Sequence, residues 1–190
     1  DFQVVVAAEV DYVGHLPGYY SVSEGECEAV ILSEDDAANA AAAGVRVMPT
    51  YGLASANFTQ KRIAEGPFTE DEEAALAAEE ARTYSVQALN LKRLRAAGVQ
   101  FVVGTDLFPG RVLEEPKRWI ELGALTPKEA LIAMFATGPT LFPGRSIGCL
   151  DAGCEADFLV LDGNPLEDLD AFSSIRFHIK SGTMLGVEPG

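Results

Sequence analysis

The sequence predicts an α/β protein in which parallel strands alternate with helices and a smaller antiparallel part follows. Strand-like and helix-like segments alternate from residue 10 to about residue 137. The main predicted helices open with recognisable N-caps. After Pro139, short strand-like segments are separated by Gly, Pro, Asn and Asp turns, with no long helix between them. That pattern is typical of a small antiparallel sheet or part of a sandwich.

The first elements follow one another closely. Residues 10–14, VDYVG, form a β-branched and aromatic run that predicts a strand. After a loop, Ser33 is the expected N-cap of a helix with acidic residues in its first turn, and Gly44 is expected to end it. Residues 45–50, VRVMPT, follow at once as a second strand.

A loop and then a long helix come next. Thr69 and Glu72 form a capping box, and Gly98 is expected to end this helix. Residues 99–106, VQFVVGTD, are a continuous apolar run, as in a strand buried on both faces. Another capping box, TPKE at 126–129, opens a helix that reaches about residue 137. We therefore expect parallel βα units in residues 1–139 and a different architecture in residues 140–190.

Composition narrows the function classes. The chain has 190 residues, of which 48% are hydrophobic, so it can bury a core. A net charge of −15 argues against nucleic acid and against anionic membrane surfaces as partners. No apolar run approaches the roughly 20 residues of a membrane span. The sequence contains no GxxxxGK[ST] or GxGxxG motif, so phosphate cradles and dinucleotide sites lack support. No Ser stands at a predicted strand-to-helix elbow, so a serine hydrolase lacks support as well.

Three cysteines, Cys27, Cys149 and Cys154, are an odd number in no zinc-finger spacing. Cys149 and Cys154 flank the turn-like LDAG and could face each other across a hairpin. The sequence favours unpaired structural cysteines over a disulfide, and a metal cluster least of all.

The candidate chemistry lies at the ends of the strands, because ligands of parallel α/β folds bind beyond the carboxyl ends of the strands. The first strand ends in His15, the second in Thr50 and Tyr51, and the third in Thr105 and Asp106. An imidazole and a carboxylate at one sheet edge suit zinc or manganese, and either group could act as a general base.

Each of these residues also has a structural interpretation. His15 could be a hydrogen-bonded structural residue, and Asp106 could cap the turn that follows it. Tyr51 is more easily explained as a residue that lines the wall of a pocket than as one that takes part in the reaction. His178 lies within IRFHIK, in the antiparallel part, and is interpreted as structural. The long loop after His15 is expected to shape the mouth of a pocket and offers Tyr19 and Tyr20 as substrate contacts.

Several segments together resemble a known family. In order they are DYVGHLPG, AAAAGVRVMPTYG, RLRAAGVQFVVGTD, LTPKEALIAMFATGPTLF, IGCLDAGCEADFLVLDGNPLEDL and IKSGTML. They resemble the C-terminal half of the metal-dependent amidohydrolase superfamily, in the branch of imidazolonepropionase-like enzymes and metal-dependent prolidases. The resemblance implies the C-terminal part of a (β/α)8 TIM-type barrel, about strands six to eight, in residues 1–139. Residues 140–190 would then supply strands of the flanking β-sandwich.

The resemblance also implies residue roles. His15 would bind the more exposed metal, and Asp106 the more buried one. Asp106 would also take a proton from the hydrolytic water and return it to the leaving nitrogen. The implied cofactor is one or two divalent ions, with zinc expected, and the implied substrate is a small amide such as a dipeptide, a lactam or another cyclic amide. Tyr19 and Tyr51 are the candidate substrate-binding residues.

This sequence lacks several of the metal ligands that are typical of the family. The family's His-x-His of strand one, its ligand on strand four and its histidine on strand five have no counterpart in this sequence. We therefore expect the N-terminal half of the barrel as a partner, supplied by another chain or by upstream sequence, and an oligomer, since three barrel strands alone leave unpaired edges and a bare hydrophobic face. The alternative is a non-catalytic scaffold or oligomerisation partner that retains the fold.

Overall fold

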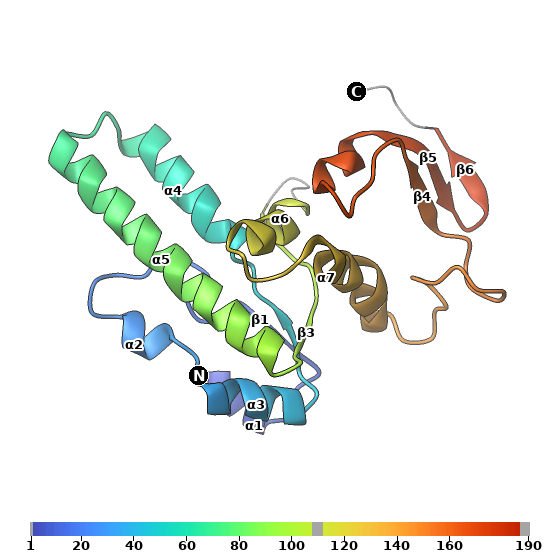
Figure 1. Ribbon diagram of the computed structural model, residues 1–190, viewed down its shortest axis with the longest axis horizontal. Coiled ribbons are helices and arrows are strands. Elements are labelled where there is room, and N and C mark those ends of the chain that lie inside the picture. Colours follow the sequence, from blue (N-terminus) through green and yellow to red (C-terminus); the bar gives the residue numbers. More distant parts are fainter. Residues whose placement is uncertain (1, 108–111, 187–190) are drawn as a thin grey trace. The chain divides into compact units, whose positions relative to one another are not determined.

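The structure is a computed structural model that describes residues 2–107 and 112–186 (Figure 1). It divides into two compact units, Asp1–Leu125 and Thr126–Gly190. The elements of the first unit, in chain order, are α1 (Phe2–Ala7), β1 (Tyr12–Gly14), α2 (Cys27–Val30), α3 (Glu34–Ala42), β2 (Arg46–Met48), α4 (Gly52–Glu65), α5 (Glu70–Ala96), β3 (Gln100–Phe101) and α6 (Glu114–Glu121). The mixture of helices and strands confirms the predicted α/β class.

The three strands of the first unit form a parallel sheet in the order β1-β2-β3. Val47 in the middle strand is opposite Val13 of β1 and Phe101 of β3. The Val102 N–H extends the third strand by donating to the Val47 carbonyl at 2.8 Å. This arrangement confirms the predicted parallel βα units. Because parallel strands share one direction, their carboxyl ends lie at the same edge of the sheet.

The predicted helix ends are confirmed where they depend on local hydrogen bonds. Ser33 and Thr69 each accept from the backbone three residues ahead, in complete capping boxes. Thr126 does the same at the start of α7 (Pro127–Ile132). Gly44 and Gly98 follow the ends of α3 and α5 in left-handed conformation, with φ of 68° and 86°. A glycine adopts this conformation without the clash that a Cβ would cause.

Helices α2 and α4 lie where the sequence predicts loops, α2 in the loop before Ser33 and α4 in the loop before residue 69. α6 lies in the segment after Asp106, where the sequence predicts no element. None of the three has a side-chain cap from its own N-cap residue, which is Glu26, Tyr51 and Leu113 in turn. The usual sequence signal for a helix start is therefore missing in all three.

Helix α5 is the longest element and lies beside α4 (Figure 1). Ala54 and Phe58 of α4 pack with Leu76 of α5 in a buried cluster. Nearer the sheet, Leu91 and Leu94 of α5 are fully buried. Charged residues occur along the length of α5, and among the described residues no helix is long and apolar enough to cross a membrane.

The second unit contains an antiparallel sheet in the order β4-β5-β6, as predicted for the tail. The helical segments of this unit, including α7, are short. The elements after α7 are η1 (Ala133–Thr137), η2 (Gly138–Leu141), β4 (Phe158–Leu161), η3 (Leu169–Ser173), β5 (Ile175–Lys180) and β6 (Thr183–Leu185). Lys180 forms an ion pair with Asp157, which ties the end of β5 to the residues before β4.

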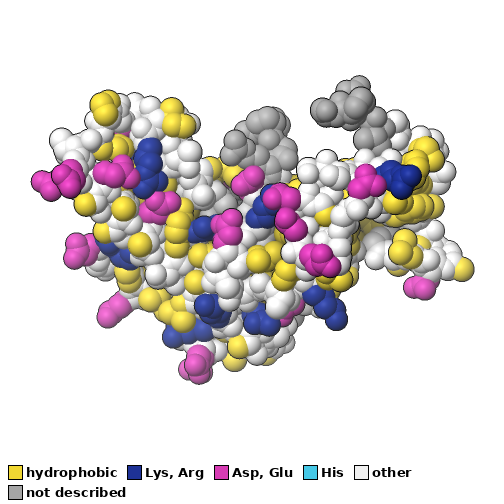
Figure 2. Space-filling view, turned by 45° about the horizontal axis from the view of Figure 1, so that its top comes forward, with side chains coloured by type: hydrophobic (Ala, Val, Ile, Leu, Met, Phe, Trp, Pro, Cys, Tyr) yellow, Lys and Arg dark blue, Asp and Glu magenta, His cyan; other side chains and the backbone are white. Residues whose placement is uncertain are grey.

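One face of this antiparallel sheet is apolar. Cross-strand pairing and the alternation of side chains place five apolar residues on it. They are Phe158, Val160, Phe177, Ile179 and Met184. None of the three strands contains a buried residue, and Met184 is 64% exposed. Figure 2 shows hydrophobic side chains at the surface of this part of the chain. We call these five residues the apolar sheet face.

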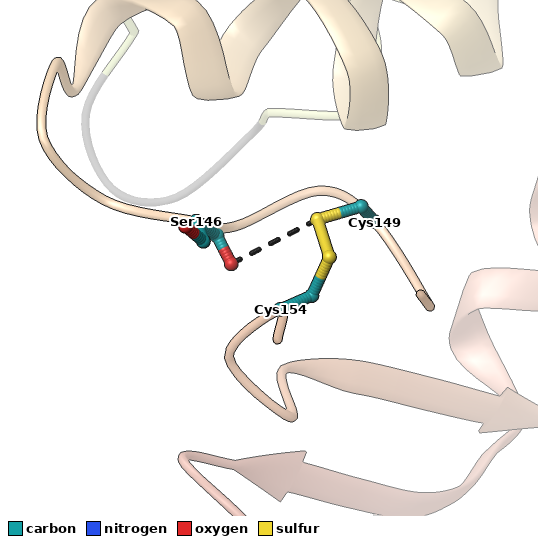
Figure 3. The surroundings of a disulfide bond; sticks show 3 residues. All are labelled: Ser146, Cys149 and Cys154. Carbon is teal, nitrogen blue, oxygen red and sulfur yellow. Dashed lines mark hydrogen bonds between the residues drawn. A yellow bond between two sulfur atoms is a disulfide. The ribbon is translucent and has the colours of Figure 1, made fainter. Parts of the chain in front are cut away.

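The expectation for the cysteines is wrong for two of the three. Cys149 and Cys154 form a disulfide across the LDAG turn, with their Cα atoms 5.9 Å apart (Figure 3). Cys27 is the free one. The turn hydrogen bond from the Cys154 N–H to the Asp151 carbonyl, at 3.1 Å, folds the segment back on itself and brings the two side chains together. Spacing alone does not reveal whether a turn closes this tightly.

Candidate active site

Three strand ends meet at the carboxyl edge of the parallel sheet. β1 is followed by His15, β2 leads through Pro49 to Thr50, and the segment after β3 reaches Asp106. All three residues have left-handed backbone, with φ of 59°, 56° and 53° respectively. Such a conformation costs a non-glycine residue about 1–3 kcal/mol, and it occurs often in active sites. A β-branched residue such as Thr50 adopts it rarely.

His15 and Asp106 are brought together at this edge. The Nε2 atom of His15 lies 3.8 Å from Oδ2 of Asp106, and the side chains are 44% and 63% exposed. Two protein ligands about 2.0–2.2 Å from one ion lie roughly 3–3.5 Å from each other. The observed separation therefore fits two ligands of a shared ion after a small adjustment of either side chain. The sequence-based prediction that both groups emerge at one edge is matched by this placement.

Gly104, in the segment that leads to Asp106, leaves room for the Met48 side chain of β2. A Cβ added to Gly104 would meet the Met48 sulfur at 2.2 Å, so this side chain would have to move. Beyond it, the Leu107 N–H donates to the Thr105 hydroxyl at 3.3 Å. This hydrogen bond spans Asp106, whose side chain is exposed.

The tyrosines named by the sequence have different positions. The Tyr19 ring lies 4.7 Å from the His15 ring, centroid to centroid, beside the candidate site. The exposed Tyr20 donates its hydroxyl hydrogen to Asn57 Oδ1 at 2.7 Å. Tyr51 is fully buried, and its hydroxyl donates to the Pro17 carbonyl at 3.0 Å. Burial raises the pKa of Tyr51 above its ordinary value. Tyr51 therefore has a packing role and presents no surface to a ligand in this structure.

A stripe of buried polar residues on α5 holds the loop that follows His15. Gln87 donates to the Gly18 carbonyl at 2.9 Å, and Thr83 accepts from the Val22 N–H at 2.9 Å. Asn90 donates to the Pro17 and Val30 carbonyls and accepts from the Leu32 N–H. Since these side chains satisfy buried backbone groups, they fix the loop that carries Tyr19. Helical spacing of Thr83, Gln87 and Asn90 was the available signal in the sequence.

Glu115 is the residue near the site that sequence reasoning missed. It belongs to α6 and is 0% exposed. Its carboxylate accepts from the backbone N–H groups of Tyr51 at 2.9 Å and Gly52 at 2.6 Å, and from the Trp119 indole at 2.7 Å. Burial raises the pKa of Glu115 to about 7, while these donors and Arg118 act in the opposite direction. Glu115 therefore caps α4 in place of a local residue, immediately after Thr50.

His15 and Asp106 are the candidate metal ligands among the described residues. Among them, no group of three or more His, Cys, Asp or Glu side chains lies close enough to hold an ion. His15 and Asp106 are suitable donors at a suitable separation, so they fit as two ligands of a site that needs others. His178 lies in β5, in the second unit, and is exposed.

The sequence of this chain is similar to the profile of a known family and to a curated relative. The profile of the amidohydrolase family matches residues 12–185. Ochratoxinase of Aspergillus niger is 36% identical over 116 residues, and the match covers 55% of this chain and 24% of that relative. The chain thus spans about a quarter of the length of the curated relative that it matches.

Solved structures share the fold over most of this chain. Ochratoxinase of A. niger has a TM-score of 0.70 at 22% identity, covering 96% of this chain and 38% of its own. A prolidase complexed with N-methylphosphonate-L-proline has a TM-score of 0.67 at 23% identity, covering 98% and 43%. A Xaa-Pro dipeptidase with bound methionine in the active site has 0.67 at 17%, covering 97% and 42%.

Proposed function

The chain belongs to the amidohydrolase family, and we propose that it forms part of a metal-dependent hydrolase that cleaves an amide C–N bond. The observation that carries the proposal is the convergence of His15 Nε2 and Asp106 Oδ2, 3.8 Å apart, at the carboxyl edge of the parallel sheet. Both groups are exposed, so a substrate and water can reach them. The names of the prolidase and the Xaa-Pro dipeptidase favour dipeptides among small amides as substrates.

The residues of this chain have defined roles in that reaction. His15, through Nε2, and Asp106 would hold one or two divalent ions, with zinc the expected one. When bound, such an ion polarises the substrate carbonyl and lowers the pKa of a nearby water. Asp106 accepts a proton as the water oxygen attacks the carbonyl carbon, and it returns that proton to the nitrogen as the C–N bond breaks. Tyr19, beside His15, is a candidate contact for the substrate.

We further propose that residues 1–139 are the C-terminal part of a (β/α)8 barrel, about strands six to eight. The parallel sheet has the order β1-β2-β3, so β1 and β3 are its edges among the described residues. A barrel leaves no strand edge unpaired. Since this chain covers 38–43% of the related solved structures, the remaining barrel strands and metal ligands would come from a partner segment, upstream or in another chain.

The apolar sheet face supports the same partnership in residues 140–190. Exposed apolar patches of this kind usually mark a surface that another element covers. Phe158, Val160 and Phe177 are 39%, 37% and 38% exposed. Further strands of a β-sandwich, from the same partner segment, would bury them. Assembly into an oligomer through these incomplete surfaces is part of the proposal.

One observation favours the alternative of a non-catalytic scaffold. The described residues lack a complete set of metal ligands. The two hypotheses predict different metal contents for the purified full-length protein. A catalytic protein binds stoichiometric divalent metal, whereas a scaffold binds none.

The test compares two Asp→Asn variants of the full-length protein. Asp106→Asn is expected to lower kcat for a dipeptide or lactam by about 10²–10⁴-fold, the usual contribution of a general acid–base. Asp71→Asn, at an exposed acid in the first turn of α5, is the matched control and should leave kcat unchanged. Chelation should abolish hydrolysis, and added Zn²⁺ should restore it. Full activity of Asp106→Asn, or activity that survives chelation, would refute the proposed mechanism.

A further inference from the structure

The Thr50 hydroxyl lies between two hydrogen-bond partners. Its Oγ1 atom donates to the Pro49 carbonyl at 2.7 Å and lies 2.9 Å from Nδ1 of His15. Thr50 is 2% exposed, so water has little access to the hydroxyl. A threonine hydroxyl has a single hydrogen and two lone pairs. It can therefore donate to one of these partners only, and the other partner must donate to it or go without a hydrogen bond.

The Thr50 hydroxyl hydrogen is donated to the Pro49 carbonyl rather than to His15. Pro49 is buried, and no backbone N–H among the described residues reaches its carbonyl. A carbonyl can only accept, and a buried acceptor without a donor is costly. The imidazole of His15 can adapt, because either ring nitrogen can carry its hydrogen. The arrangement that satisfies all three groups has Thr50 donating to Pro49 and accepting from His15 Nδ1–H.

We infer that Thr50 is a positioning residue for His15, which keeps the imidazole hydrogen on Nδ1 and directs the lone pair of Nε2 toward Asp106. This inference rests on the proposed metal site and specifies how one of its ligands is oriented. A ligating histidine needs its second nitrogen held by an acceptor, since that contact sets both the tautomer and the rotation of the ring. The same arrangement holds for a protonated imidazole, whose Nδ1 also carries a hydrogen.

Thr50 is itself held in place by α6. Its left-handed φ of 56° is unusual for a β-branched residue and must be maintained by its surroundings. The two backbone N–H groups that follow, of Tyr51 and Gly52, are both bound by the buried Glu115. Glu115 is in turn fixed by the Trp119 indole at 2.7 Å. A path of direct contacts therefore runs from α6 through the Thr50 turn to His15.

Three substitutions in the full-length protein test the inference. Thr50→Val keeps the β-branched shape and removes the hydroxyl, whereas Thr50→Ser keeps the hydroxyl. Loss of such an outer contact typically weakens metal binding by about 10–100-fold. We expect that loss of Zn²⁺ affinity for Thr50→Val, measured by competition with a chelator, and a near-native affinity for Thr50→Ser. His15→Ala shows whether His15 is a ligand at all.

A second readout does not depend on metal. ¹⁵N NMR of the histidine-labelled, metal-free protein distinguishes the ring nitrogen that carries hydrogen from the one that does not, and His15→Ala identifies the signals. We expect hydrogen on Nδ1 in the native protein and in Thr50→Ser, and its redistribution toward Nε2 in Thr50→Val. Hydrogen on Nε2 in the native protein, or an unchanged tautomer and Zn²⁺ affinity in Thr50→Val, would overturn the inference. Unchanged affinity in His15→Ala would instead refute the metal role of His15, while the NMR signals would still decide the role of Thr50.

Discussion

In the first unit the middle strand is enclosed, and Val47 has no exposed surface, whereas in the second unit no residue of β4, β5 or β6 is buried. Phe101 of the parallel sheet packs against Trp119 of α6, and the left-handed residues His15, Thr50 and Asp106 lie where the strands end. The antiparallel sheet of the second unit instead exposes an apolar face along its strands. A covered sheet can hold polar groups in fixed positions at its edge, while an uncovered one offers a surface for a partner.

The largest change in the free energy of unfolding is expected from a substitution in the core of the first unit. Trp119 is fully buried, its ring lies 5.8 Å from that of Phe101, and its indole donates to Glu115. Trp119→Ala should lower the free energy of unfolding by about 3–5 kcal/mol, from the lost packing, in addition to leaving a buried carboxylate short of a donor. Urea denaturation measures the change. A loss below about 1 kcal/mol would show that this unit is not packed as described.

A smaller effect is expected from the pH dependence of Glu115. Its pKa in the folded protein is about 7, against an ordinary value of 4.5, mainly because of burial. Between these values the folded state binds more protons than the unfolded state, so the free energy of unfolding rises as the pH falls from above 7 toward 4.5. The full contribution is about 3 kcal/mol, at 1.36 kcal/mol for each pKa unit. Arg118 and the Tyr51 and Gly52 N–H groups oppose the burial effect and limit it.

Glu115→Gln provides the reference for that measurement, because Gln does not titrate. It places an NH₂ group opposite one of the backbone N–H donors and should therefore be less stable than the native protein throughout. The difference between the two proteins, measured by urea denaturation at pH 8 and at pH 4.5, should be larger at the lower pH. A difference independent of pH would mean that Glu115 titrates at its ordinary value.

The smallest change in the free energy of unfolding is expected in the second unit, at the apolar sheet face. If a partner segment covers the apolar sheet face in the full-length protein, Phe177→Ala should cost about 2 kcal/mol there, near the value for a fully buried Phe. His178→Ala is the control, since the adjacent side chain is exposed on the opposite face, and it should change stability by less than about 0.5 kcal/mol. Equal effects of the two substitutions would indicate that the sheet face stays exposed.

The parts of the fold that were predictable depend on contacts within a few residues. Ser33, Thr69 and Thr126 cap helices through backbone groups three positions ahead, so their signals are local. The apolar runs of the strands are local as well, and parallel pairing then places His15 and Asp106 at one edge. α4 escaped prediction because its cap, Glu115, lies 63 and 64 positions from the N–H groups it binds. The disulfide escaped because turn closure depends on backbone geometry.

By itself, the sequence determined which residues end the strands and where the locally capped helices begin, since hydrogen bonds between near neighbours and the alternation of apolar runs decide both. Only the tertiary structure decided that the Thr50 hydroxyl meets the ring of His15 across 35 positions, and that Glu115 binds the two backbone N–H groups that follow Thr50. The physical reason is that a left-handed threonine and a buried carboxylate are unfavourable alone. They become stable only when distant segments supply the donors and acceptors that each requires.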